Sequence, residues 1–228
     1  MEVDPLGDSA LLLRFPKTVT IDKLLEMERR LAVAKLPGVI ELAPAYETLA
    51  VFYDPVAVTT DEDASAFEIL SRKIVELLNV PGSAPSARRM KLVEIPVCYG
   101  GAFGPDLEEL AKHARLSAEE VIRRHCGARY RVSCLGFTPG FPYLSGLPNE
   151  LSMPRRASPR QQVPAGAVAI GGNQTGVYPI ASPGGWNLIG RTPLALFSAS
   201  NDPPALLQAG DEVRFRPIDR AEYDSLGQ

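Results

Sequence analysis

Arginine, amide and aromatic side chains gather in the second half of the chain, where they could bind a small anion that also carries an amide. Arg156 and Arg160 lie in a proline-rich loop, Gln174 lies in a glycine-rich turn, and Trp186 follows two glycines. A guanidinium can hold a carboxylate through two parallel hydrogen bonds, and we expect Arg160 to do so. The amides of Gln174 and Asn187 offer a donor and an acceptor to a lactam. For Trp186 two interpretations stay open, a core anchor and a pocket wall.

The stretch Gly136–Pro148, GFTPGFPYLSGLP, is a second candidate for a binding element. Its glycines and prolines are typical of turns, but Phe137, Phe141 and Tyr143 need something to cover them. Gly140 would let the backbone approach a ligand or a partner closely. We therefore favour an element that lines a pocket or a subunit interface, and the choice between these two stays open.

Charge is distributed unevenly along the chain. Residues 121–200 hold eight Arg, no Lys and one acid, Glu150, so this segment carries +7 while the whole chain carries −3. Arginine without lysine favours planar recognition of carboxylate or phosphate, although these side chains could equally pair with acids of the remaining chain or of a partner. The net negative charge and the absence of an extended basic, aromatic surface argue against nucleic acid.

The histidines and cysteines give weaker signals. His125 follows Arg124 near the end of an expected helix, where it could change its charge near neutral pH and bind or transfer a proton, or could simply favour the helix dipole. A metal or Cys-His site from His125, Cys126 and Cys134 is disfavoured because no fourth ligand is evident. No catalytic residue is identified, and we expect no metal.

Cysteine usage and the N-terminus predict the setting of the protein. Three Cys form no even-numbered framework, which indicates a reducing, cytoplasmic location. The N-terminus lacks the basic start of a signal peptide, and no apolar run is long enough to span a membrane. GGNQTG lacks the GK[ST] ending of a nucleotide-binding loop, so we do not expect this chain to bind ATP through such a loop.

The elements that must position these residues form two domains, 1–84 and 85–228. In the first, ALLLRF, GVIELAP and TLAVFY predict strands, while the apolar spacing after Thr20 and between Asp63 and Leu78 predicts two helices. The stretch from Pro81 to Arg89 reads as a linker.

The second domain opens with a strand, KLVEIPVCY, and two helices whose expected N-caps are Asp106 and Ser117. Gly127 is expected to follow the second helix. Short β-branched runs then alternate with Gly and Pro, among them RYRVSCLGF, AVAIGG, LALFS and EVRFRP. The fold class we predict is an α+β N-terminal domain followed by a mainly-β barrel.

Three long motifs resemble one known family. GFTPGFPYLSGLP, PRRASPRQQVPAGAVAIGGNQTGVYPIASPGGWNLIGRTPLALF and AGDEVRFRPI, with YDP at Tyr53–Pro55, are similar to the family of the 5-oxoprolinase B subunit, also described as KipI or allophanate hydrolase subunit 1. The resemblance spans essentially the whole chain. It implies a cyclophilin-like barrel and the fold of half a carboxyltransferase region.

The resemblance also implies a function. It implies a protein that works with the A and C subunits of 5-oxoprolinase to open the 5-oxoproline lactam to glutamate with ATP. We expect the chain to be inactive alone, and nothing in its sequence resembles a biotin acceptor site or a metal site. The motifs carry over as candidates for binding the anionic lactam or a partner protein onto His125, Gly140, Phe141, Arg156, Arg160, Gln174, Tyr178, Trp186 and Arg191. Two alternatives are an inhibitor that binds a sensor histidine kinase and a subunit that handles urea or allophanate.

Overall fold

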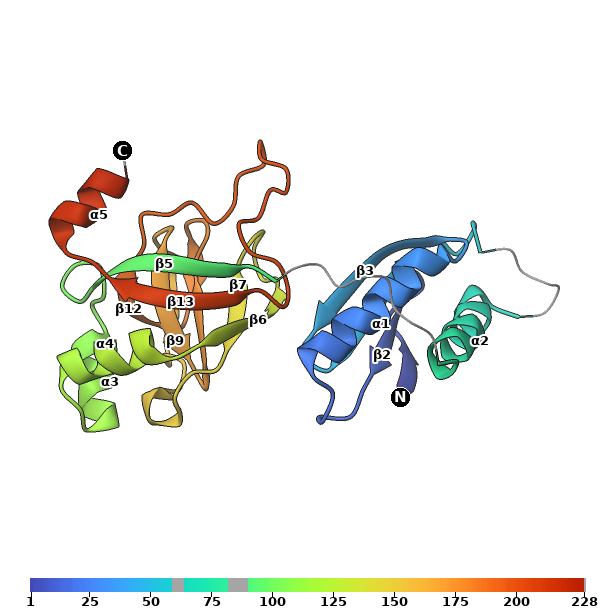
Figure 1. Cartoon of the computed structure of the whole chain (residues 1–228), viewed down its shortest axis with the longest axis horizontal. Coiled ribbons are helices and arrows are strands. Elements are labelled where there is room, and N and C mark those ends of the chain that lie inside the picture. Colours follow the sequence, from blue (N-terminus) through green and yellow to red (C-terminus); the bar gives the residue numbers. More distant parts are fainter. Residues whose placement is uncertain (59–63, 82–89, 228) are drawn as a thin grey trace. The chain divides into compact units, whose positions relative to one another are not determined.

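The computed structural model describes residues 1–58, 64–81 and 90–227, which divide into two compact units, 1–89 and 90–228 (Figure 1). The predicted end of the first domain, at residue 84, lies outside the described residues.

The first unit is a four-stranded antiparallel sheet with two helices on one face. The strand order is β1-β2-β4-β3. Its elements are β1 (Glu2–Pro5), β2 (Ala10–Arg14), α1 (Ile21–Ala34), β3 (Val39–Ala45), β4 (Thr48–Tyr53) and α2 (Ala66–Asn79). All are as predicted except β1, which has too few apolar residues to stand out in the sequence.

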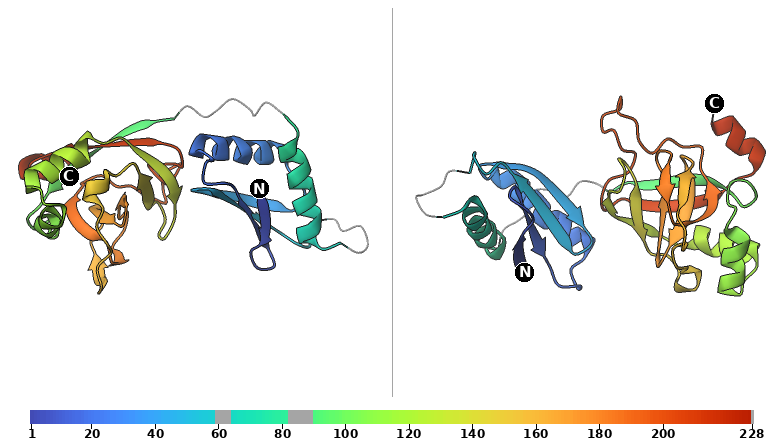
Figure 2. Two further views of the ribbon diagram at one scale, coloured as in Figure 1. Left: turned by 90° about the horizontal axis from the view of Figure 1, so that it is seen from below. Right: turned by 180° about the vertical axis from the view of Figure 1, so that it is seen from behind.

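In β2 and β4 every second residue is apolar and points to the same face of the sheet, and both helices pack on that face. Leu11 and Leu13 of β2 face the same side as Leu49 and Val51 of β4, and buried residues of α1 and α2 pack against them in one cluster (Figure 2). Thr20 caps α1 as predicted. The start of α2 is capped by Ser65, and Asp63 lies outside the described residues.

The second unit is a closed barrel of seven strands in the order β10-β7-β6-β13-β5-β12-β9. Only β13 and β5 run parallel; the other pairs are antiparallel. The strands are β5 (Leu92–Tyr99), β6 (Tyr130–Leu135), β7 (Pro142–Ser145), β9 (Ala167–Gly171), β10 (Gln174–Val177), β12 (Asn187–Arg191) and β13 (Glu212–Pro217). The predicted fold class, an α+β domain followed by a barrel, is confirmed.

Smaller elements surround the barrel. They are α3 (Leu107–Ala114), α4 (Ala118–Gly127), η1 (Asn149–Leu151), a two-stranded sheet of β8 (Arg160–Val163) and β11 (Ser182–Gly184), and α5 (Arg220–Leu226). Helix α4 packs against β13 and α3 against β12, while inward-facing residues such as Val97, Val132 and Ile189 fill the core.

Several details of this unit differ from the sequence prediction. Arg160 and Gln174, expected in a loop and in a turn, are instead the first residues of β8 and β10. LALFS is not a strand, because only Phe197 makes an isolated bridge to Ala205. Helix α4 includes Gly127 as its last residue, and Ala128 is its C-cap. Ser117 caps α4 as predicted, but the side chain of Asp106 makes no capping hydrogen bond to α3. The Asp106 carboxylate instead binds two arginines.

Candidate functional site

A pocket of about 310 Å³ opens at the side of the barrel where β7, β10 and β11 meet their loops. Its lining residues are aromatic, arginine, proline or glycine: Phe137, Phe141, Tyr143, Arg155, Arg156, Pro159, Tyr178, Pro183, Gly184, Gly185 and Trp186. The volume lies at the small end of the range usual for ligand sites. Four of the predicted site residues, Phe141, Arg156, Tyr178 and Trp186, therefore meet in one cavity.

The ring-bearing walls of the pocket are fixed by edge-to-face packing. The Phe141 ring lies 5.1 Å from Tyr178 and 5.5 Å from Trp186, at interplanar angles of 80° and 87°. All three belong to one buried cluster. Trp186 is thus both a core anchor and a pocket wall, and both interpretations of it hold.

Two of these rings pack directly against glycines. A Cβ on Gly171 would lie 2.6 Å from the indole of Trp186, and one on Gly184 would lie 2.3 Å from the Tyr178 hydroxyl oxygen. Both distances are far below van der Waals contact, so the two rings occupy the space that a side chain would need. The glycine-rich composition of this segment is therefore partly a packing requirement of the pocket.

The loop at Gly136–Phe141 forms one rim. It is closed by backbone hydrogen bonds, with Gly136 N donating to Phe141 O over 3.1 Å and Phe141 N donating to Thr138 O over 3.0 Å. Phe137 is 61% exposed and has a φ of 68°, in the left-handed region that side chains other than glycine rarely adopt. Gly140, with a φ of 79°, packs against Phe197, where a Cβ would approach the Phe197 Cβ to 2.8 Å. The loop is thus an ordered turn that lines a pocket.

A buried carboxylate organises the arginines next to the pocket. Asp106 is 4% exposed, and its Oδ1 accepts hydrogen bonds from Arg156 Nη1 at 3.0 Å and Arg160 Nη2 at 2.8 Å. Its Oδ2 accepts from the backbone N of Leu188 at 2.7 Å. Arg160 does not line the pocket. In the described structure its guanidinium pairs with Asp106, whereas we expected it to hold a substrate carboxylate.

Arg155 also lines the pocket, although its place in the sequence did not single it out. Its guanidinium carbon lies 5.8 Å from the centroid of the Trp186 ring. No carboxylate of the described residues pairs with it. The motif Pro154-Arg155-Arg156 contains two adjacent arginines, and sequence alone could not decide which of the two would be neutralised.

The pocket tyrosines are neutral at physiological pH. Burial raises the pKa of Tyr143 and of Tyr178, although nearby Arg155 acts in the opposite direction on both. Both hydroxyls therefore remain protonated, and the site has no negative charge among its described lining residues.

His125 lies in the barrel core and does not line the pocket. It is completely buried, and burial lowers its pKa to about 3, so the prediction that it changes charge near neutral pH is wrong. Thr175 Oγ1 donates to Ala169 O and so accepts from His125 Nε2, 3.0 Å away. The other ring nitrogen, Nδ1, then accepts from the Tyr99 hydroxyl at 2.8 Å. Every polar atom of this neutral imidazole is satisfied inside the fold.

The remaining predicted residues hold the barrel together. Arg191 Nε donates to Ala165 O over 2.7 Å, and Gln174 opens β10 opposite Gly171. Asn187, expected to recognise a lactam, is buried, and its amide donates to Pro154 O and Ile170 O. None of these three lines the pocket.

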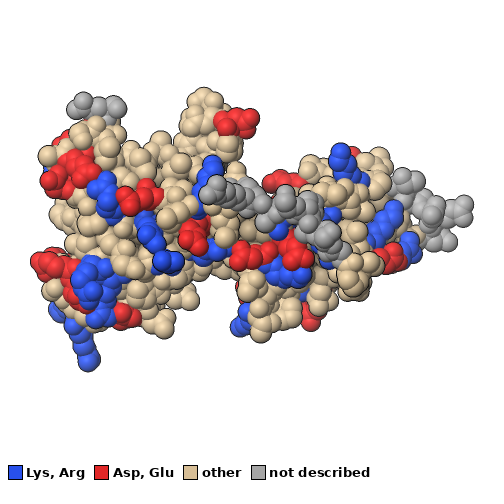
Figure 3. Space-filling model, in the orientation of Figure 1, with Lys and Arg blue, Asp and Glu red and all other residues tan. Residues whose placement is uncertain are grey.

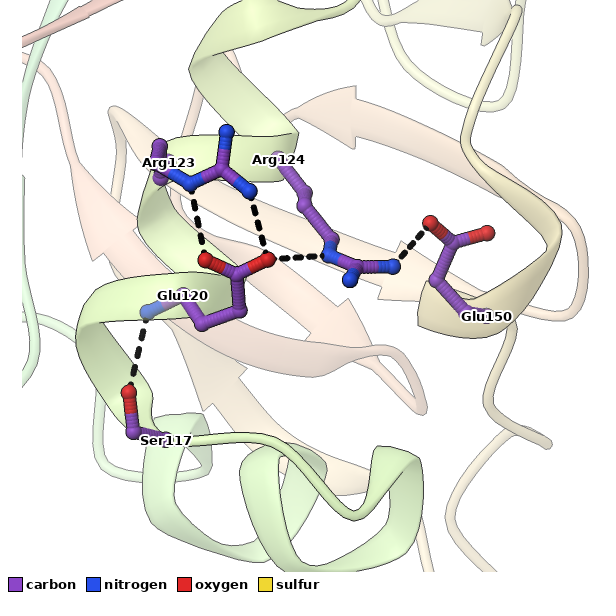
Figure 4. Close-up of polar contacts among 5 residues, drawn as sticks. All are labelled: Ser117, Glu120, Arg123, Arg124 and Glu150. Carbon is purple, nitrogen blue, oxygen red and sulfur yellow. Dashed lines mark hydrogen bonds and ion pairs between the residues drawn. The ribbon is translucent and has the colours of Figure 1, made fainter.

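Arginines elsewhere in the basic segment pair with acids. On α4, Glu120 accepts from both Arg123 and Arg124, and Arg124 also reaches Glu150 of η1 (Figure 4). The face drawn in Figure 3 accordingly shows basic and acidic side chains interspersed, without a large patch of one sign. Internal pairing, the second of the two interpretations, therefore explains Arg123, Arg124, Arg156 and Arg160.

The described residues hold three free cysteines and no cluster of His, Cys, Asp or Glu that could bind a metal ion. Among their helices, none is long and apolar enough to cross a membrane.

The fold and pocket define a two-part protein, a small α+β sheet domain followed by a closed barrel with an aromatic, arginine-rimmed pocket. Residues 1–207 match the family model "Carboxyltransferase domain, subdomain C and D". The chain is 46% identical to the B subunit of 5-oxoprolinase from Bacillus subtilis (strain 168), over 97% of this chain and 95% of that protein. It is 44% identical to the B subunit of 5-oxoprolinase from Escherichia coli O157:H7, over 93% and 94%. The chain belongs to the carboxyltransferase subdomain C and D family and, within it, to the 5-oxoprolinase B subunits, which confirms the resemblance noted from its motifs.

Solved structures share the fold of this chain. TTHA0988 superposes with a TM-score of 0.73 at 39% identity, and the match covers 92% of this chain but only 40% of that one. The urea amidolyase of Kluyveromyces lactis has a TM-score of 0.73 at 18% identity, over 98% of this chain and 15% of that one, which shows the shared fold alone.

Proposed function

We propose that this chain is the B subunit of an ATP-dependent 5-oxoprolinase, which opens the 5-oxoproline lactam to glutamate. The observation that carries the proposal is the alignment with the Bacillus subtilis protein named as the B subunit of 5-oxoprolinase, at 46% identity over nearly the full length of both chains. A chain that aligns end to end, with its pocket inside the aligned region, supports a shared role.

The chemistry of the described pocket suits a protein that binds and orients. Its aromatic, glycine, proline and arginine lining can hold a small ring and an anionic group, and such positioning is a large part of catalysis. An unstrained lactam is a poor electrophile, and ATP used by the complex would supply a phosphoryl group that activates the amide oxygen. The turn GGNQTG joins β9 to β10 as a hairpin, so we assign the nucleotide to the complex and not to that turn.

Two further parts of the proposal concern the assembly. We propose that the chain is inactive alone and acts in the cytoplasm with the A and C subunits of 5-oxoprolinase, the latter fused or separate. The match to TTHA0988, in which a similar segment makes up less than half of a longer chain, supports a partner polypeptide.

Deletion of the gene for this chain in the native organism tests the proposal. We expect 5-oxoproline to accumulate and growth on 5-oxoproline as nitrogen source to stop, with both restored by the intact gene. Unchanged 5-oxoproline in the deletion strain would contradict the proposal. If the same strain instead showed raised autophosphorylation of a sensor histidine kinase, the kinase-inhibitor interpretation would replace it.

A further inference from the structure

We infer that the barrel pocket binds the substrate through its carboxylate on Arg155, and that it selects a small ring whose nitrogen is uncharged. This inference rests on the proposed function and adds to it the residue that recognises the substrate and the chemical class that the pocket accepts. The three arginines near the pocket differ in whether a carboxylate already holds them.

Arg156 and Arg160 already have an anion. Both guanidiniums donate to the same buried oxygen, Asp106 Oδ1, at 3.0 and 2.8 Å. Arg156 is held further by its backbone N, which donates to Gly185 O over 2.7 Å. A guanidinium fixed in this way on a buried carboxylate is a structural cation, because releasing it would leave the carboxylate buried without its partner.

Arg155 is in the opposite situation. Its side chain is exposed, lines the pocket and stacks near Trp186, and no carboxylate of the described residues pairs with it. A guanidinium packed near an indole keeps its outward hydrogen-bond donors available for an anion. Arg155 is therefore the lining residue able to form a two-pronged pair with an incoming carboxylate.

The rest of the described lining sets the preference for an uncharged ring nitrogen. It includes no Asp or Glu, and its tyrosines are neutral. An ammonium brought into this pocket would lose water without gaining a counter-ion, which is costly. A lactam N–H carries no charge and avoids this cost, so the pocket distinguishes 5-oxoproline from proline, whose five-membered ring bears the same carboxylate but a charged nitrogen.

Trp186 provides a direct readout, since it is the one tryptophan of the chain. We would follow its fluorescence while titrating the full chain with 5-oxoproline, with proline, and with 2-pyrrolidinone, which has the lactam but no carboxylate. We expect a saturable change with 5-oxoproline. The affinities for proline and for 2-pyrrolidinone should be lower by a factor of about ten or more, which is the size of effect that a lost charged hydrogen bond or an unpaired buried charge produces.

Two variants test whether Arg155 binds the carboxylate of 5-oxoproline. Arg155→Gln should weaken 5-oxoproline about tenfold or more and leave 2-pyrrolidinone unchanged, because only the carboxylate contact is lost. Arg129→Gln is the matched control, an exposed arginine of the same basic segment that does not line the pocket, and it should bind as the wild type does.

The outcomes separate this inference from the proposed function. If the assembled three-subunit enzyme releases glutamate, but Trp186 does not respond to 5-oxoproline and Arg155→Gln keeps the wild-type KM, the inference is wrong and the proposed function stands. Equal binding of proline and 5-oxoproline would overturn the selection for an uncharged ring nitrogen. If the assembled enzyme is inactive while Trp186 fluorescence still shows that small cyclic carboxylates bind in a way that depends on Arg155, the pocket is as inferred and the proposed function is wrong.

Discussion

Asp106 Oδ1 lies 2.8 Å from Arg160 Nη2, and the carboxylate is almost completely buried while the guanidinium is partly exposed. This pair joins the start of α3 to β8, whose Arg160 lies opposite Gly184 of the pocket lining. The relationship makes Arg160 part of the support of the pocket.

Removing the carboxylate should be more harmful than removing either arginine. Asp106→Ala leaves two guanidiniums and the Leu188 N–H without their acceptor, and we expect a loss of about 3–5 kcal/mol in the free energy of unfolding. Arg160→Ala leaves Asp106 paired with Arg156, and we expect about 1–3 kcal/mol. Denaturant unfolding measures both.

The matched control for these variants is Arg123→Ala, which breaks an exposed pair with Glu120 on α4 and should change stability little. If Asp106→Ala were no more destabilising than Arg123→Ala, the supporting role of the buried carboxylate would be disproved.

His125 predicts a pH dependence of stability. Its folded pKa of about 3 lies below the ordinary value of 6.5, so the unfolded chain takes up the proton first. The resulting stability is complete above about pH 6.5 and is lost as the pH falls toward 3, by at most about 1.4 kcal/mol per pH unit. His125→Gln should flatten this slope, measured by unfolding between pH 7 and about 4.

His113→Gln, at an exposed position of α3, is the comparison variant for this measurement. A ring of His125 that titrates near pH 6.5 in an NMR experiment would contradict the buried, neutral network.

The contact between Trp186 and Gly171 predicts a spectroscopic effect. Gly171→Ala places a methyl group 2.6 Å from the indole, so the ring must move outward, and we expect a loss of about 1–3 kcal/mol with a red shift of tryptophan emission. Gly136→Ala, where an added Cβ meets nothing within 4 Å, should change neither property. Identical spectra for the two variants would show that Trp186 does not rest on Gly171.

Phe137 is expected to serve binding more than folding. Its ring is largely exposed and its backbone is left-handed, a conformation that asparagine tolerates better. Phe137→Asn should therefore change the free energy of unfolding by less than about 0.5 kcal/mol, as at other surface sites, yet weaken 5-oxoproline binding. A variant that binds normally but unfolds easily would reverse this assignment.

The sequence predicts the elements well where periodicity is strong. Apolar spacing predicts helices α1 and α2, capping-box spacing predicts α3 and α4, and β-branched runs predict most strands of both units, while the motifs identify the family. The short β1 and the irregular segment around Phe197 are not predicted correctly, because their patterns are too brief to compete with tertiary contacts.

The site is predicted less completely, for a physical reason. Phe141, Tyr178 and Trp186 do meet in a pocket, but the partner of Arg156 and Arg160 comes from Asp106, some fifty residues earlier, and local spacing favours a helix cap for that residue. The burial of His125 depends on barrel closure around Tyr99 and Thr175. Such long-range pairings decide which charges remain available, and local sequence does not contain them.

The most direct test is glutamate release by the purified A, B and C subunits, mixed with 5-oxoproline and ATP, with this chain present or omitted. We predict activity that requires all three proteins and both substrates, and that is restored when this chain is added back. Equal glutamate release without this chain, or none from the complete and correctly folded mixture, would contradict the account.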